Sequence, residues 1–67
     1  MKVLETTRVR ATVELSAEEV HMVNNALNEI CNGIDIAEFE VRLGLSRPEV
    51  TETLSAVQRL WAQMSLG

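Results

Sequence analysis

Apolar and polar residues alternate one by one over residues 7–15 of the chain. Alternation with a period of two is typical of a β-strand that has one face against a core. No second segment of similar quality is present, although residues 2–4 extend the pattern a little. Because the backbone groups of a lone strand need partners, we expect this strand to pair with its twin in a second copy. The apolar face of this dimer strand consists of Val9, Ala11 and Val13.

Three six-residue segments share one pattern: an apolar residue, Ser or Asp, two free positions, Glu, and a second apolar residue. The Ser or Asp oxygen can accept a hydrogen bond from the backbone three residues on, while the Glu reaches back to the cap. This pattern marks a helix start, and the three capping residues are Ser16, Asp35 and Ser46. We therefore predict helices at about residues 16–31, 36–43 and 47–65, and the first two are followed by stop signals at Asn32-Gly33 and at Gly44.

Each predicted helix carries apolar residues at helical spacing, so one face of each can pack on a common core. The sequence therefore predicts a single small α+β domain, with one N-terminal strand, three helices, and no linker or repeat beyond the caps. The apolar positions are Val20, Val23, Leu27 and Ile30 in the first helix, Ile36, Phe39 and Leu43 in the second, and Val50, Leu54, Val57, Trp61 and Met64 in the third.

The length of 67 residues brings the chain close to the limit at which one core suffices. Its hydrophobic content of 46% excludes a disordered chain. Cys31 is the only cysteine, so no internal disulfide can form, and association with a second copy is the remaining way to gain stability. The cysteine usage and the lack of a membrane span or secretory signal lead us to expect a cytoplasmic protein, of bacterial type by conjecture.

The formal net charge of −4 opposes a general affinity for nucleic acid. The charge is uneven, because residues 1–12 carry three cations against one acid and the remainder carries three cations against nine acids. The first segment is therefore locally basic, whereas the rest is acidic.

The polar side of the first helix is rich in amides, which are poor helix formers. A row of neutral donors and acceptors on one face can bind the backbone of a partner or a polar ligand, and a merely solvated face is the alternative. The candidate partner-binding residues are His21, Asn24, Asn25, Asn28 and Asn32.

Catalytic and metal-binding patterns are weak. Glu18 and His21 have the spacing of half a di-iron motif, but both fall on the polar face, so we interpret the pair as incidental. Cys31 is expected to be a small core residue, because it lies near the edge of the apolar stripe at a helix C-terminus. It lacks a base for nucleophilic catalysis, since the only histidine lies on another face of the same helix. The glycines are isolated and form no phosphate loop. We expect no enzymatic activity, no cofactor and no metal.

The segment from Arg8 to Val23, about a quarter of the chain, resembles the opening of ribbon-helix-helix repressors. In that family two chains pair one strand each, and the outward strand residues enter the major groove of DNA. The resemblance implies DNA contacts by Arg8, Arg10 and Thr12, whose side chains suit base edges and phosphates. The chain departs from the family in having three predicted helices after the strand instead of two.

Residues 36–57 resemble a helix-turn-helix, with a turn at Gly44-Leu45-Ser46. The small residue usual in the first helix of that motif is replaced by Glu40, and the second helix presents one cation, Arg47, beside two acids. A purely structural three-helix core explains the same pattern. The apolar positions that carry the resemblance are Phe39, Leu43, Leu45 and Val50.

The sequence thus favours a small non-enzymatic, homodimeric protein-interaction module of unknown partner. The alternative is a small DNA-binding regulator of ribbon-helix-helix or helix-turn-helix type. A third possibility is an anionic mimic that occupies a nucleic-acid-binding protein, which shares the acidic charge.

Overall fold

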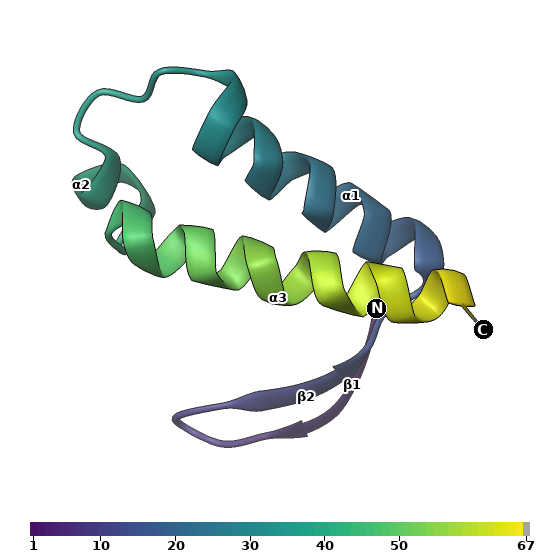
Figure 1. Cartoon of the computed structure of the whole chain (residues 1–67). Helices are drawn as coiled ribbons and strands as arrows, with labels where there is room; N and C mark the ends of the chain where they lie inside the picture. Colours follow the sequence, from purple (N-terminus) through teal and green to yellow (C-terminus); the bar gives the residue numbers. More distant parts are fainter. Residues whose placement is uncertain (67) are drawn as a thin grey trace.

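The computed structural model describes residues 1–66 as an α+β fold, in which an antiparallel two-stranded hairpin precedes a mostly helical body. The two long helices pack side by side, and the hairpin projects away from them (Figure 1). The elements are β1 (Lys2–Thr6), β2 (Ala11–Glu14), α1 (Ala17–Asn28), the π-helix η1 (Glu29–Gly33), α2 (Phe39–Leu43) and α3 (Arg47–Leu66).

The N-terminal region corrects the prediction of one strand over residues 7–15. Only Ala11–Glu14 of that segment is extended, and its partner is β1 of the same chain, with Val3 opposite Val13 and Thr6 opposite Ala11. Residues 7–10 form the turn, where the backbone N–H of Thr7 donates to the carbonyl of Arg10 at 2.8 Å. The backbone N–H groups of Val9 and Arg10 donate to the Thr7 hydroxyl, so this one side chain organises the turn.

The start of α1 confirms the first predicted capping box. The Ser16 hydroxyl accepts from the backbone N–H of Glu19 at 3.1 Å, and the Glu19 carboxylate accepts from the Ser16 N–H at 3.0 Å. The terminal ammonium of Met1 also donates to Glu19, at 2.7 Å. These hydrogen bonds, the one from the terminal ammonium first, lower the pKa of Glu19 to about 2. The box therefore fixes the start of α1, and the Met1 ammonium links the start of the chain to it.

The end of the first helix agrees with the sequence in position but not in conformation. α1 continues through η1 to Gly33, two residues beyond the predicted limit of Cys31. Among the described glycines only Gly44 has a positive φ, so the expected left-handed stop at Gly33 is wrong. A Cβ atom at Gly33 would lie 2.5 Å from the Glu29 carboxyl group, but this group is the far end of a flexible exposed side chain and can move away, so packing does not require a glycine here.

The second predicted capping box, at Asp35, does not form. α2 begins at Phe39, three residues later than predicted, and follows Glu38 in the left-handed conformation with φ 55°. Glu38 makes no side-chain capping bond. The predicted end at Gly44 is confirmed, because Gly44 has φ 78° and its N–H donates to the Glu40 carbonyl.

The third capping box is confirmed at the start of α3. The Glu49 carboxylate accepts from both the backbone N–H and the hydroxyl of Ser46, at 3.1 and 2.8 Å. These bonds, the backbone one first, lower the pKa of Glu49. Pro48 lies in the first turn of the helix, where a missing N–H costs nothing.

The core is small and lies entirely within the helical body. Val20, Phe39, Val50 and Leu54 are the buried hydrophobic residues of the described chain. α1 packs along α3, and Phe39 of α2 is also buried. The hairpin contributes no residue to this core, which leaves its own apolar side chains in solvent.

The accessible surface of the chain is larger than that of a compact folded protein of the same mass. Its accessible area is 5412 Å², whereas a compact folded chain of 7.5 kDa exposes about 4,200 Å². Its radius of gyration is 13.3 Å, against about 11 Å for a compact domain of this length. Projection of the hairpin accounts for this open shape (Figure 1).

Candidate functional site

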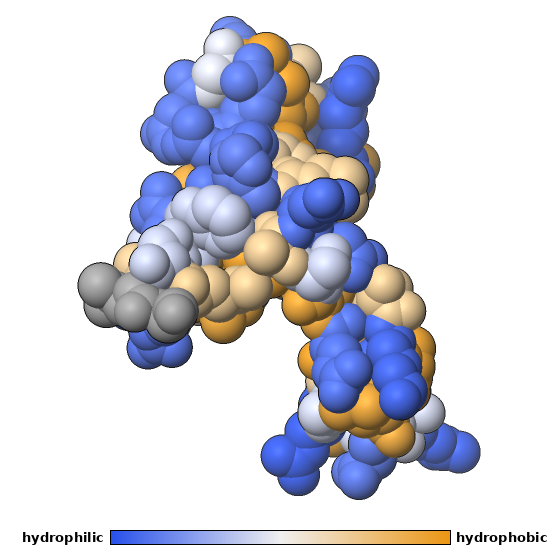
Figure 2. All heavy atoms as spheres, turned by 90° about the vertical axis from the view of Figure 1, so that its right-hand side faces the viewer, coloured by the Kyte–Doolittle hydropathy of each residue, from blue (hydrophilic) through white to orange (hydrophobic). Residues whose placement is uncertain are grey.

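The projecting hairpin is the most unusual surface of the molecule. Every residue of β1 and β2 is exposed, including Val3, Leu4 and Val13, whose exposed fractions are 58%, 50% and 37%. Apolar atoms gather on the hairpin, which stands apart from the helices in Figure 2. An isolated two-stranded hairpin is at best marginally stable in water, so this element calls for a further contact.

The edge of β2 that faces away from β1 offers backbone groups for such a contact. The carbonyl of Arg10 accepts from Thr7 and therefore points toward β1. Along a strand these directions alternate, so the N–H and C=O groups of Thr12 also point toward β1 and those of Ala11 and Val13 point outward. Within residues 1–66 no strand lies beyond this edge. It can therefore accept another strand.

The tip of the hairpin carries Arg8, Val9 and Arg10, with Val9 88% exposed. Neither arginine takes part in an ion pair within the described residues. The predicted DNA-contacting set is thereby divided, because Arg8 lies in the turn and Thr12 lies in β2. Val9 is likewise in the turn and not on the strand assigned to the dimer, whereas Ala11 and Val13 are in β2.

The hairpin and the helical body carry opposite charge. Residues 1–14 hold three cations and two acids, a net charge of +1, while residues 15–67 hold three cations and eight acids, a net charge of −5. The negative net charge of the whole chain, −4, thus comes from the helical part. A basic, apolar hairpin attached to an acidic body is a surface suited to association more than to phosphate binding.

The amide row of α1 is only partly a free face. The His21 ring stacks on Trp61 of α3, with ring centroids 4.9 Å apart and planes at 8°. Asn24 Oδ1 is buried without a hydrogen-bond partner. Asn32 donates to Asn28 at 3.1 Å, so these two amides partly satisfy each other. Of the five predicted residues, Asn25 is exposed and forms none of these side-chain contacts.

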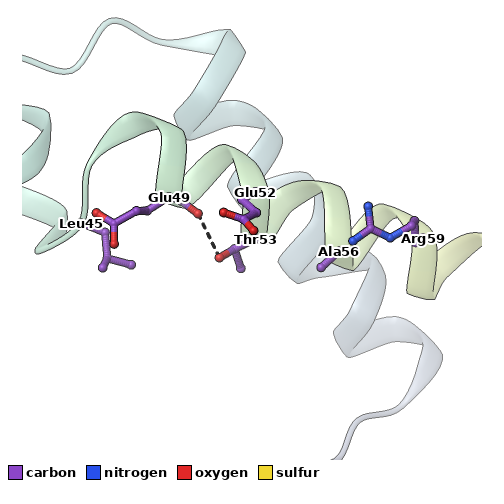
Figure 3. Close-up of a pocket in the computed structure, with 6 residues that line it drawn as sticks. All are labelled: Leu45, Glu49, Glu52, Thr53, Ala56 and Arg59. Carbon is purple, nitrogen blue, oxygen red and sulfur yellow. Dashed lines mark hydrogen bonds between the residues drawn. The ribbon is translucent and has the colours of Figure 1, made fainter.

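Two hollows lie near the start of α3. A small apolar pocket of about 170 Å³ is formed between α1, η1, α2 and α3. A wider, shallow hollow of about 480 Å³ runs along α3 and has one wall only, because all its residues come from α3 or from Leu45 just before it (Figure 3). In it the Thr53 hydroxyl donates to the Glu49 carbonyl at 3.2 Å. The pocket is lined by Leu27, Ile30, Leu43, Leu45, Val50 and Thr53. The hollow is lined by Leu45, Glu49, Glu52, Thr53, Ala56 and Arg59.

The remaining candidate residues, Arg47 and Cys31, form contacts within the chain. The Arg47 guanidinium lies over the Phe39 ring, 4.4 Å from its centroid, which accounts for this side chain without DNA. The Thr51 hydroxyl is 3.9 Å from the sulfur of half-buried Cys31. No group of three metal-ligating side chains is found among the described residues. In that same part of the chain, no helix is both long and apolar enough to cross a membrane.

Comparison with known proteins adds no assignment: no family model, curated protein or solved structure matches the chain. The candidate site therefore depends on the chain's own geometry. Sequence analysis missed β1, whose residues face Ala11–Glu14. The available signal was the extended pattern at residues 2–4, but the turn at residues 7–10 contains none of the Gly, Asn or Pro residues that usually announce a hairpin.

Proposed function

We propose that the protein is a small, non-enzymatic interaction module that works as a homodimer built on its hairpin. The observation that carries this proposal is the excess of accessible surface, about 1,200 Å² over a compact chain of the same mass. A standard protein interface buries about 800 Å² on each partner, so this excess is large enough to supply one. The hairpin contributes much of this surface and no core residue.

The dimer forms when the outward edges of β2 from two copies pair antiparallel around a two-fold axis. This pairing satisfies the outward N–H and C=O groups of Ala11 and Val13 and converts two marginal hairpins into one four-stranded sheet. Such an isologous contact uses the same edge on both chains and closes after two copies. The helices then remain free on the outside, where the partner surfaces of the module would lie.

The test of the dimer is the solution mass by light scattering over a range of concentrations. The expected result is about 15 kDa, twice the mass of the 7.5 kDa chain. Val13→Pro removes an outward N–H without touching a bond to β1, and should give a monomer with an intact helical spectrum. Val13→Ala is the matched control, because it keeps the N–H and should remain dimeric. A wild-type monomer at high concentration would refute the proposal.

A second candidate, DNA binding, is favoured by one observation: Arg8 and Arg10 stand exposed at the hairpin tip without ion pairs among the described residues. Tips of this kind can enter a DNA groove and contact phosphates. Retention on heparin at low salt, compared with an Arg8→Ala, Arg10→Ala double variant, tests this function. A wild-type chain that passes through unretained excludes it.

A further inference from the structure

The faces of the hairpin restrict how two β2 edges can meet. A shift by one residue would place the apolar side of one strand beside the polar side of the other. The two-fold axis must therefore pass through one residue and not between two. An axis through any residue of β2 keeps like faces together, but at Glu14 it would place two like charges opposite each other, so Ala11, Thr12 and Val13 remain.

Charge selects among these positions. With the axis at Thr12, Arg10 of one copy lies opposite Glu14 of the other, and the pair occurs twice. With the axis at Ala11, Glu14 would need Arg8 as its partner. Both arginines precede β2, but Arg10 is its direct neighbour and its carbonyl pairs with Thr7 across the hairpin, whereas Arg8 lies deeper in the turn and forms no such bond among the described residues. With the axis at Val13, Arg10 would face Ser16 and no opposite charges would meet. Opposite charges directly across a strand pair are favourable, so Thr12 is the preferred centre.

The register of the existing hairpin extends this pattern across four strands. Lys2 of β1 already lies opposite Glu14 of β2. In the dimer, Arg10 of the second copy would lie on the other side of Glu14, so the three charges across the sheet would alternate in sign. Val3 lies opposite Val13, which would then face Ala11 of the second copy and give an apolar row. One register therefore aligns both the charges and the apolar residues.

We propose that two copies pair their β2 edges about Thr12, and that the Arg10–Glu14 pairs make a second copy of this chain the preferred strand partner. The inference depends on the proposed dimer and gives it a register and a specificity. It assigns Arg10 to the dimer contact, which leaves Arg8 as the only free cation of the hairpin tip among the described residues.

Exchange of charges tests the pairing. Chains with Arg10→Glu alone or Glu14→Arg alone would oppose like charges twice, and each should dimerise on the order of tenfold more weakly than the wild type. An equimolar mixture of the two should form heterodimers with restored affinity, because each chain supplies the sign that the other lacks. Arg8→Glu is the matched control and should dimerise like the wild type. Restored affinity in the mixture would also show that the single variants are not misfolded. It would exclude, in particular, a hairpin disrupted by repulsion between Lys2 and the side chain introduced by Glu14→Arg.

Cross-linking tests the axis itself. In a Cys31→Ser background, Thr12→Cys should form a disulfide between copies, because residues at the axis face each other directly across the two strands. Ala11→Cys or Val13→Cys cross-linking faster than Thr12→Cys would overturn the register while leaving the dimer standing. A dimer insensitive to both Arg10 and Glu14 variants would overturn the charge selection. A wild-type monomer would instead remove the proposed function with it.

Discussion

Leu54 lies at the centre of the four-residue core and gives the sharpest test of how the fold is stabilised. Its exposed fraction is 4%, whereas Leu60 on the same helix is 41% exposed. Leu54→Ala removes three buried carbon atoms, at about 0.8 kcal/mol each, and the remaining cavity raises the loss to about 3 kcal/mol. Leu60→Ala should cost about 1 kcal/mol, because much of that side chain already meets water.

Urea unfolding followed by circular dichroism, at one fixed protein concentration, measures the difference. For a chain of this size the slope is about 1 kcal/mol per molar urea, so Leu54→Ala should lower the midpoint by about 3 M. Because so small a domain rarely exceeds about 3–5 kcal/mol of stability, this variant should be near its unfolding midpoint without urea. Equal losses for the two variants would show that the core does not lie where the structure places it.

Three further outcomes are expected. The pKa of Glu19 is lowered to about 2 from an ordinary 4.5, so its stabilising effect is present above about pH 4.5 and disappears toward pH 2. Thermal midpoints between pH 2 and 6 should therefore fall more in the wild type than in Glu19→Gln, which keeps only the acid-sensitive contribution of other groups such as Glu49. Ser46→Ala should lower the free energy of unfolding by about 1 kcal/mol and lower the melting temperature, because Ser46 caps α3. Asp35→Ala should leave the melting temperature unchanged, because Asp35 does not cap α2. Glu38→Gly should raise stability by about 0.5–1 kcal/mol, because φ 55° is strained for a residue with a Cβ atom, and a lower melting temperature would contradict this account.

The parts of the fold that sequence predicted correctly are those decided by neighbouring residues. Ser16 and Ser46 are followed at the right distance by a Glu, and both capping boxes form. The second box, at Asp35, does not form, because the chain adopts a left-handed conformation at Glu38 that the local pattern does not reveal. The fold class was confirmed at the level of an N-terminal β-element followed by three helices.

The candidate site was less predictable, because it depends on contacts between distant elements. The helical periodicity of the sequence placed His21 on the polar side of its helix. In the structure, however, the His21 ring stacks on Trp61 of α3. The angle and offset between two packed helices decide that contact, and neither is encoded in the periodicity of one helix. The hairpin was missed for a related reason, since pairing between residues 2–6 and 11–14 lacks a recognisable turn sequence.

The separation between hairpin and core also has a kinetic consequence. Since all four buried side chains belong to the helices, the hairpin can open without disturbing them. The molecule therefore has two units of cooperativity, and amide hydrogens of the hairpin should exchange with solvent through local opening, long before those of α1 and α3. Two copies that join along β2 would combine their two hairpins into one unit across the axis. Dimerisation should therefore be detected first as slower exchange of the amide hydrogens in the hairpin, the part of the chain that lies outside the core.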